Sequence, residues 1–219
     1  MALFQGQKLE VVETAVKEAT KQVWPELVTG PLNELFDIQI ETLKARDCPQ
    51  SVIDVLISKK SEVIAKATEI ETVNGHIPFV PVIPRTEVNL DDLMKMVRDR
   101  EGYNYLNQSD VSNVVDVPKK PYFIYDVENG KNMLGKSPTK AEILIKKQNR
   151  SCLTADEGIA LCIHTNVLSE HYVDCTGSRY KHSDLVPCVY LYDGRPRLYW
   201  SSTDLSDDEW GSASCRSRA

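Results

Sequence analysis

The sequence predicts an α plus β fold, in which an amino-terminal helical region precedes a mixed domain with a small, largely antiparallel sheet. Three observations favour this fold: helical spacing of apolar residues before residue 75, a proline-studded apolar break after it, and strand-like runs joined by tight turns in the remainder. We therefore divide the chain into a helical region, residues 1–75, and a mixed α+β domain, residues 76–219, which carries the candidate site.

Apolar residues recur every three or four positions in the amino-terminal region. This spacing predicts three amphipathic helices, over Leu9–Val23, Leu32–Leu43 and Pro49–Ala67. Pro49 suits the first helical position, where a missing N–H group costs nothing. Short amphipathic helices are marginal in water by themselves, so we expect the three to bury their apolar faces in a bundle.

The segment Ile77–Pro84 marks the boundary between the two regions. It is apolar but contains three prolines, which cannot donate to a strand ladder and favour an edge strand or a polyproline-like segment. Asn89 is the expected cap of the next helix, which should run to about Arg98.

The mixed domain begins its regular structure with an aromatic and β-branched run, Pro121–Asp126, which predicts a strand ending in the turn Glu128–Gly130. Ser137 is expected to precede a helix that starts with proline. Thr154, followed three residues later by Glu157, fits the capping box that opens a helix.

The last strands are predicted to form a hairpin. Val186–Tyr192 and Arg195–Ser201 flank the pair Asp193–Gly194, a two-residue turn that requires positive φ at glycine. Trp200 lies on the second strand and is expected to pack in the core. Trp210 follows a short acidic cluster that we interpret as a solvated loop.

Composition excludes several classes of function. A formal net charge of −6 argues against binding to a phosphate backbone, so we expect no nucleic-acid partner. No run approaches the roughly 18 apolar residues of a membrane helix, and the amino terminus lacks a secretory signal pattern. We therefore expect a soluble cytoplasmic protein with free thiols, no membrane partner and no cofactor requirement for folding.

Four short motifs occur in the carboxyl-terminal two thirds of the chain: Pro121–Gly130, Leu153–Leu161, Gly177–Arg179 and Trp210–Cys215. Together, and in this order, they resemble an uncharacterised bacterial family, a domain of unknown function. The resemblance covers roughly Ile77 to Arg218 and implies no activity.

Five of the six cysteines and three of the four histidines fall between Cys152 and Cys215, which points to the last third of the chain for any chemistry. Cys215 lies among small residues next to arginine, a setting that favours a thiol nucleophile. His164 or His171 would then be its base. The structural alternative is a Gly-Ser-rich segment that lies against the sheet with the thiol turned inward.

A ligand-binding role is predicted for Ser178 and Arg179, since a hydroxyl and a guanidinium beside a glycine can grip a carboxylate or phosphate. Ser212 and Ser214 are expected to complete the site beside Cys215 in one shared recess. In the competing structural interpretation, Arg179 pairs with a nearby acid such as Asp174 or Asp184.

A zinc site is the remaining chemical alternative, although no Cys-x-x-Cys pair is present. Buried free thiols explain the cysteines equally well. We rank a non-enzymatic ligand- or protein-binding module first, because no recognisable base, nucleophile and orienting group occur together. A thiol-dependent or hydrolytic enzyme using Cys215 comes second, with Arg179 binding its substrate, and a Cys/His structural zinc protein third.

Overall fold

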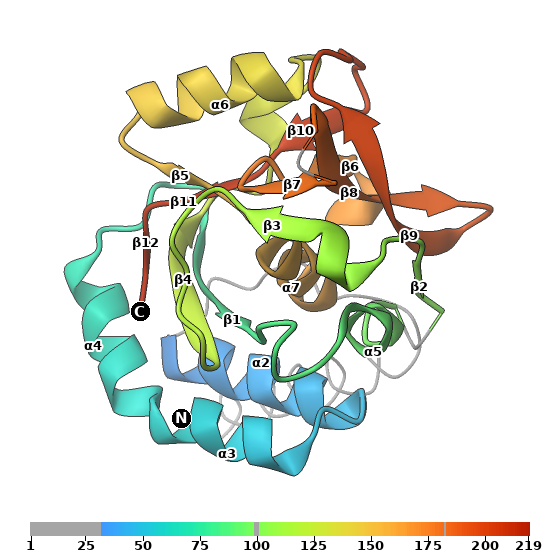
Figure 1. Cartoon of the computed structure of the whole chain (residues 1–219). Helices are drawn as coiled ribbons and strands as arrows, with labels where there is room; N and C mark the ends of the chain where they lie inside the picture. The colour runs from blue at the N-terminus through green and yellow to red at the C-terminus, as the bar shows by residue number, and fades with distance from the viewer. Residues whose placement is uncertain (1–31, 99–100, 182) are drawn as a thin grey trace, which may run out of the picture.

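The computed structural model describes residues 32–98, 101–181 and 183–219 (Figure 1). The expected helix Leu9–Val23 and His182 lie outside the described residues. The fold is α+β, as predicted, with helices at the amino-terminal side and two main sheets beyond them. Helix α7, Ala155–His164, lies centrally and is buried along its whole length.

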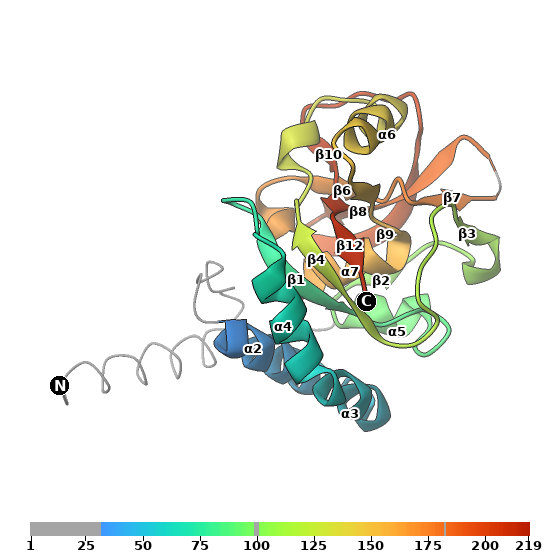
Figure 2. The ribbon, with the colours of Figure 1, turned by 90° about the vertical axis from the view of Figure 1, so that its left-hand side faces the viewer.

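The amino-terminal helices are α2 (Leu32–Ala45), α3 (Gln50–Ser58) and α4 (Lys60–Glu69), which lie together at one side of the molecule (Figure 2). The single helix expected over Pro49–Ala67 is wrong, because the chain breaks at Lys59. The break turns α4 away from α3, so that α4 packs on strands β1 and β4 as well as on α2. Pro49 caps α3 and is not its first helical residue.

A three-stranded antiparallel sheet has the order β1 (Ile77–Val82), β4 (Tyr122–Val127) and β12 (Ser217–Arg218). Strand β1 is an edge strand, as its prolines predict, because proline has no N–H group to donate to a neighbouring strand. Strand β4 confirms the predicted aromatic strand, and all its residues are buried.

The second sheet has five strands in the order β10 (Trp210–Ser212), β6 (Tyr172–Asp174), β8 (Leu185–Tyr192), β9 (Arg195–Ser202) and β2 (Tyr103–Asn104). The three inner strands pair antiparallel, whereas each outer strand pairs parallel to its neighbour. Segments that are far apart in the sequence therefore meet in this sheet.

The predicted hairpin is confirmed as β8 and β9. Asp193 and Gly194 form its turn with φ of 51° and 72°. The expectation that Trp200 packs in the core is wrong: it lies near the end of β9, is 37% exposed and stacks on Tyr199.

Local capping signals are confirmed in two helices. Asn89 caps α5 by accepting from the amide of Asp92, but this helix stops at Lys95, short of the predicted Arg98. The capping box of Thr154 and Glu157 opens α7. The remaining elements are α6 (Pro138–Lys147), β3 (Val111–Asn113), β5 (Ser151–Cys152), β7 (Ser178–Tyr180), β11 (Ser214–Cys215) and the short 3₁₀ turns η1 (Gln108–Asp110), η2 (Lys131–Met133) and η3 (Val167–Ser169).

The main hydrophobic core is continuous from α2 through β1 and β4 to α7 and the inner face of the five-stranded sheet. A smaller apolar cluster lies between helix α6, Met133 of η2 and Cys152 of β5. Within the described ranges, every helix is too short or too polar to cross a membrane.

Candidate functional site

The predicted site segments meet at strand β5. Cys215 pairs with Ser151 across the β5–β11 ladder. The backbone N–H of Gly177 donates to the carbonyl of Leu153 at 2.8 Å, directly after β5. Glycine is required at 177 because a Cβ atom there would lie 2.6 Å from the carbonyl oxygen of Cys152. The segments are therefore neighbours, but backbone and side chains fill the space between them.

Cys215 is fully buried. Burial, with a smaller contribution from Glu157, raises the pKa of its thiol to about 12, although the nearby Arg218 and Arg150 oppose the rise. Nucleophilic cysteines have lowered pKa values and partial exposure, so this environment does not favour a thiolate at neutral pH.

His164 is the last residue of α7, about 10 Å along the helix from Glu157, which lies beside Cys215. Both ring nitrogens are buried without a hydrogen-bond partner. Burial, assisted by Arg46, lowers the imidazole pKa to about 3. The ring is therefore neutral at physiological pH.

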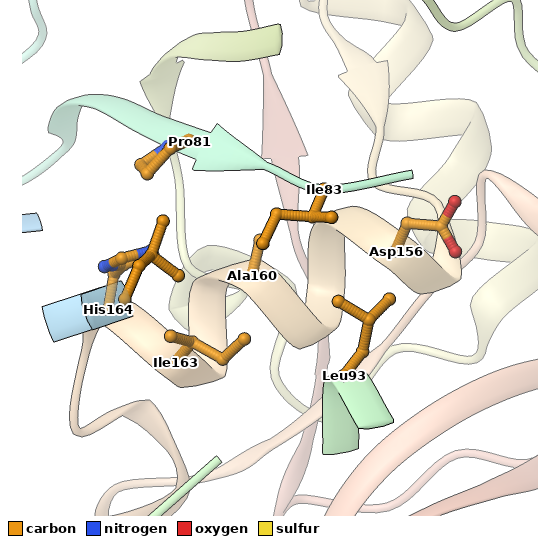
Figure 3. Close-up of a pocket in the computed structure, with 8 residues that line it drawn as sticks. Pro81, Ile83, Leu93, Asp156, Ala160, Ile163 and His164 are labelled. Carbon is orange, nitrogen blue, oxygen red and sulfur yellow. The ribbon is translucent and has the colours of Figure 1, made fainter. Parts of the chain in front are cut away.

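A narrow cavity lies beside His164, between α7, β1, α2 and α5 (Figure 3). It leaves no room for a water molecule. The histidine is at one end and Asp156 is at the other, with aliphatic side chains and Pro81 between them. Its size and lining are those of a packing defect in the core.

His171 precedes β6 and is 4% exposed. Its Nδ1 lies 3.0 Å from the carbonyl oxygen of Tyr172, and its Nε2 has no hydrogen-bond partner. The imidazole ring packs beside Gly130. The backbone of Gly130 also packs closely against the backbone of Gly211. Neither His171 nor His164 hydrogen-bonds to Cys215, so the expected pairing of base and nucleophile is not assembled in the described part of the chain.

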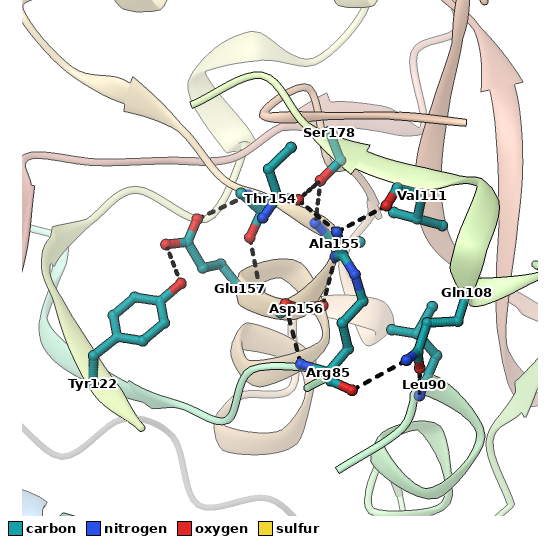
Figure 4. Close-up of polar contacts among 11 residues, drawn as sticks. Arg85, Leu90, Gln108, Val111, Tyr122, Thr154, Ala155, Asp156, Glu157 and Ser178 are labelled. Carbon is teal, nitrogen blue, oxygen red and sulfur yellow. Dashed lines mark hydrogen bonds and ion pairs between the residues drawn. The ribbon is translucent and has the colours of Figure 1, made fainter. Parts of the chain in front are cut away.

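Ser178 organises the start of α7 (Figure 4). Its hydroxyl accepts from the backbone N–H of Ala155 at 3.0 Å and donates to Oδ1 of Asn113 at 2.8 Å. The side chain is fully buried, so both of its hydrogen bonds are used inside the protein.

Arg179 pairs with Glu142 on α6 at 2.8 Å, and not with Asp174 or Asp184. Its Nη1 donates to the carbonyl oxygens of Thr176 and Ser178. These bonds tie β7 to α6 and occupy most of the guanidinium donors that a ligand would need.

The two serines near Cys215 differ. The hydroxyl of Ser214 accepts from Nε of Arg150 at 2.9 Å. The hydroxyl of Ser212 is buried and has no hydrogen-bond partner. Ser212 is thus a predicted ligand-binding residue whose hydroxyl is not used within the protein. The hydroxyl is buried, however, so a ligand in solution cannot reach it.

Glu157 receives four hydrogen bonds, and Figure 4 shows those from Tyr122 and Thr154. Arg218 donates to both carboxylate oxygens, at 2.6 and 2.8 Å, and the Tyr122 hydroxyl donates at 2.8 Å. The backbone N–H of Thr154 supplies a fourth hydrogen bond, at 2.8 Å. This carboxylate locks β12 and β4 to α7.

Asp126 is a second such centre and has a left-handed backbone, with φ of 48°. Its carboxylate accepts from Nη1 of Arg150 at 2.7 Å and from the backbone N–H of Val73 at 3.1 Å, and lies 2.8 Å from Nδ1 of His76. Burial alone would raise the pKa of this carboxyl, but these hydrogen bonds outweigh it and hold the pKa below its usual value. We refer to three buried ion pairs as the polar core: Glu157–Arg218, Asp126–Arg150 and Asp156–Arg85.

Asp174 differs from these carboxylates because, in the described part of the chain, no arginine or lysine pairs with it. Burial, with a smaller contribution from Asp207, raises its pKa to about 7, although a hydrogen bond from the Ser201 hydroxyl at 3.4 Å opposes the rise. Across the ranges that the structure describes, no three His, Cys, Asp or Glu side chains are grouped to hold a metal ion.

The outer face of the five-stranded sheet carries a row of aromatic side chains. The register places Trp210 beside Tyr172 on neighbouring strands. Their ring centroids are 5.1 Å apart, and the row continues through Tyr190 at 6.0 Å, then Tyr199 at 6.4 Å, then Tyr105 at 6.0 Å. We call this surface the aromatic face; its members are Tyr103, Tyr105, Tyr172, Tyr190, Tyr192, Arg197, Tyr199 and Trp210.

Arg197 lies within the aromatic face. Its guanidinium carbon is 4.8 Å from the ring centroid of Tyr103, 5.4 Å from that of Tyr105 and 5.8 Å from that of Tyr192. Nη1 donates to the Tyr105 hydroxyl at 2.8 Å, while Nε is buried without a partner. Three rings around one cation make a rigid, amphipathic end to the row.

The opposite end of the row is acidic. Trp210 directly follows the exposed residues Asp207, Asp208 and Glu209, and the carbonyl of Glu209 accepts from the backbone N–H of Tyr172. The aromatic face thus has negative charge at its β10 end and Arg197 at its β2 end.

The aromatic face was not predicted from the sequence, but a signal for it exists. Aromatic or arginine residues recur two positions apart in Tyr103-x-Tyr105, Tyr190-x-Tyr192 and Arg197-x-Tyr199. Residues two apart in a strand share a face of the sheet. Because the partner strands are distant in sequence, the pattern alone does not show that these pairs share one surface.

A family model described as a family of unknown function (DUF5701) matches residues 36–219. The chain belongs to the DUF5701 family. The predicted resemblance to an uncharacterised family is thereby confirmed, and the match extends into α2, beyond the segment expected from the motifs. Neither the curated proteins nor the solved structures include a match to the chain.

Proposed function

We propose that this protein is a non-enzymatic binding module that recognises a protein partner through the aromatic face. The observation that carries the proposal is the continuous series of ring contacts from Trp210 on β10, across β6, β8 and β9, to Tyr105, which directly follows β2. Tyr105 is 56% exposed and Tyr199 is 38% exposed, so the rings remain accessible although they contact one another.

Tyrosine, tryptophan and arginine are the residues enriched at the centres of protein interfaces, because they bury large area with little loss of side-chain freedom. Here they are already ordered by contact with one another, which reduces the entropy lost on binding. The predicted site around Cys215 gives weaker support to a reaction, since its thiol is protonated, neither His164 nor His171 hydrogen-bonds to it, and Ser214 is engaged by Arg150.

The six cysteines support a further part of the proposal, a cytoplasmic location. All six are free and buried. Unpaired thiols are usual in a reducing compartment, whereas secreted proteins generally pair them. Microscopy of the tagged full-length chain tests this location, and an extracellular signal would contradict it.

Selection from a random peptide display library on the full-length protein tests the proposed function. We expect enrichment of peptides that bind the wild-type chain, with binding reduced about tenfold or more in Tyr199→Ala. Tyr199→Phe keeps the ring and should retain most of the binding.

The control is Ile57→Ala on α3, which removes an exposed apolar side chain from another part of the molecule. Circular dichroism and thermal unfolding confirm that each variant is folded. Absence of any enrichment, or enrichment of peptides that Tyr199→Ala binds equally well, would exclude the aromatic face as the binding surface.

A further inference from the structure

We infer that the protein partner of the aromatic face is a second copy of the same chain, packed face to face about a two-fold axis that runs along the strand direction. This inference rests on the proposed function and names the partner of that surface. It follows from the distribution of charge along the aromatic face, from its rings and from its exposed area.

The two ends of the aromatic face carry opposite charge. The loop 203–209, which leads into Trp210, contains four acids and no lysine or arginine, and all four acids are exposed. Towards β2, Arg195 is exposed and lies on the same face of β9 as Arg197. Asp193, in the hairpin turn, offsets part of this positive charge. The surface is therefore negative at one end and positive at the other.

This polarity selects one way of packing two copies face to face. A two-fold axis that runs between the two sheets along the strand direction turns the row of rings end for end. It places the acidic end of each copy on the basic end of the other, so that both contacts join opposite charges. It also keeps the strands of the two sheets aligned, as in packed β-sheets. A two-fold axis along the row would instead place like ends together, which repel.

The middle of the aromatic face is suited to contact with its own copy. Tyr190 and Tyr199 lie there, with ring centroids 6.4 Å apart and ring planes at 64°. Residues near a two-fold axis meet the same residues of the partner copy, so tyrosine rings would meet tyrosine rings. Aromatic pairs prefer edge-to-face or offset contacts, and Tyr199 keeps 38% of its surface exposed for them.

The exposed area of the aromatic face fits a weak dimer. Four of its tyrosines keep between 38% and 63% of their surface exposed: Tyr103, Tyr105, Tyr192 and Tyr199. A tyrosine offers about 150–250 Å², so these four supply on the order of 400 Å². That is about half of the roughly 800 Å² that each partner buries in a standard interface. We therefore expect a dissociation constant of roughly 10–100 μM.

Sedimentation velocity of the full-length protein tests the inference. The wild-type chain should sediment as a monomer at about 1 μM and mainly as a dimer at about 200 μM. Tyr199→Ala should weaken self-association about tenfold or more, because it removes a ring from the centre of the interface. Ile57→Ala on α3 should leave it unchanged. Circular dichroism checks that each variant is folded.

Two charge-reversal variants test the two-fold arrangement at low salt. The first carries Asp208→Lys and Glu209→Lys at the acidic end, and the second carries Arg195→Glu at the basic end. Each variant alone loses the attraction at both contacts, so its self-association should weaken about tenfold or more. Mixed in equal amounts, the two variants again join opposite charges. The mixture should therefore associate at least about fivefold more tightly than either variant alone.

Other outcomes overturn the inference and separate it from the proposed function. If the chain stays monomeric at about 200 μM while display-selected peptides bind in a Tyr199-dependent manner, the partner is a different protein and the proposed function stands. Self-association that Tyr199→Ala leaves unchanged uses another surface and also overturns the inference. A mixture of the charge variants that associates no more tightly than each alone would exclude the two-fold arrangement. If there is neither Tyr199-dependent self-association nor binding of a selected peptide, both the inference and the proposed function are wrong.

Discussion

The polar core and the aromatic face use side chains in opposite ways. In the polar core, charged groups that are typical of active sites are buried and hydrogen-bonded to one another, as Glu157 is to Arg218. On the aromatic face, rings that are typical of a protein interior lie at the surface, as Tyr105 and Tyr199 do. Charged residues therefore need not form an active site, and aromatic residues need not lie in the core. A better guide to function is whether a side chain still has exposed surface or hydrogen-bonding groups with which it can contact a ligand.

The largest effect is expected from breaking the polar core. Arg218→Met leaves the Glu157 carboxylate buried without its cation, and loss of one partner of a buried pair destabilises by about 3–5 kcal/mol. Urea unfolding monitored by circular dichroism measures the change. The control is Tyr105→Ala on the aromatic face, which should change the free energy of unfolding by less than about 1 kcal/mol. Equal losses in the two variants would show that the regions do not differ as described.

A pH-dependent effect should come from Asp174, which is buried on the same face of the five-stranded sheet as Tyr172, near the acidic end of the aromatic face. Its pKa is about 7 in the folded protein, against an ordinary value of about 3.9 in the unfolded chain. Between these values the folded state binds more protons, so stability from this group is present below about pH 4 and is lost as pH rises to about 7.

Asp174→Asn removes the titration, so the stability difference between the variant and the wild type should change by on the order of 3 kcal/mol in favour of the variant from pH 4 to pH 7. Urea unfolding at several pH values measures it. A constant difference across this range would show that Asp174 titrates normally.

A smaller effect is expected at the glycine contact that joins β10 to the turn after β4. A methyl group at Gly130 would lie 2.8 Å from the Gly211 carbonyl oxygen and 3.2 Å from the His171 ring, at a φ of 108°. Gly130→Ala should therefore destabilise by about 2–3 kcal/mol, from overpacking together with backbone strain. Gly194→Ala introduces backbone strain without overpacking, since nothing lies within 4 Å of the added Cβ atom. It should lower the free energy of unfolding by about 1 kcal/mol. Thermal unfolding compares the two, and a larger loss at Gly194 would contradict the packing argument.

The smallest effect is expected from thiol reagents on the folded protein. All six cysteines are buried, and burial raises the thiol pKa of Cys48 and Cys215 to about 12. At pH 7.5 we expect the disulfide reagent DTNB to react no faster than the chain unfolds, with complete reaction in denaturant. A single fast thiol that disappears in Cys215→Ser would instead support the thiol-enzyme hypothesis.

Local signals in the sequence predicted local structure well. The capping box at Thr154, the cap at Asn89 and the turn at Gly194 are confirmed because each depends on residues within four positions of one another. The break at Lys59 was missed because apolar spacing continues across it, and tertiary contacts of α4 decide where the helix turns.

The site was harder to predict, for a physical reason. Arg179, Ser178 and Ser214 were predicted to bind a ligand, but in the structure they bond to Glu142, Asn113 and Arg150, which lie 37 to 65 positions away in the chain. A sequence shows which polar side chains need hydrogen-bond partners. It does not show which distant residues the fold will place beside them. The aromatic face was missed for the same reason, since its five strands come from four separate segments of the chain: β2, β6, the hairpin β8–β9, and β10.

The order of strands in the five-stranded sheet has a consequence for folding kinetics. Strand β2 pairs with β9, and β10 pairs with β6, so both edges close through contacts between residues far apart in the sequence. Topologies of this kind fold slowly, in milliseconds to seconds, because a long loop must close before its contacts can form. The aromatic face is complete only after β2 and β10 have both paired at the edges of the sheet. A partner that contacts the whole aromatic face would therefore bind the folded protein and not a late folding intermediate.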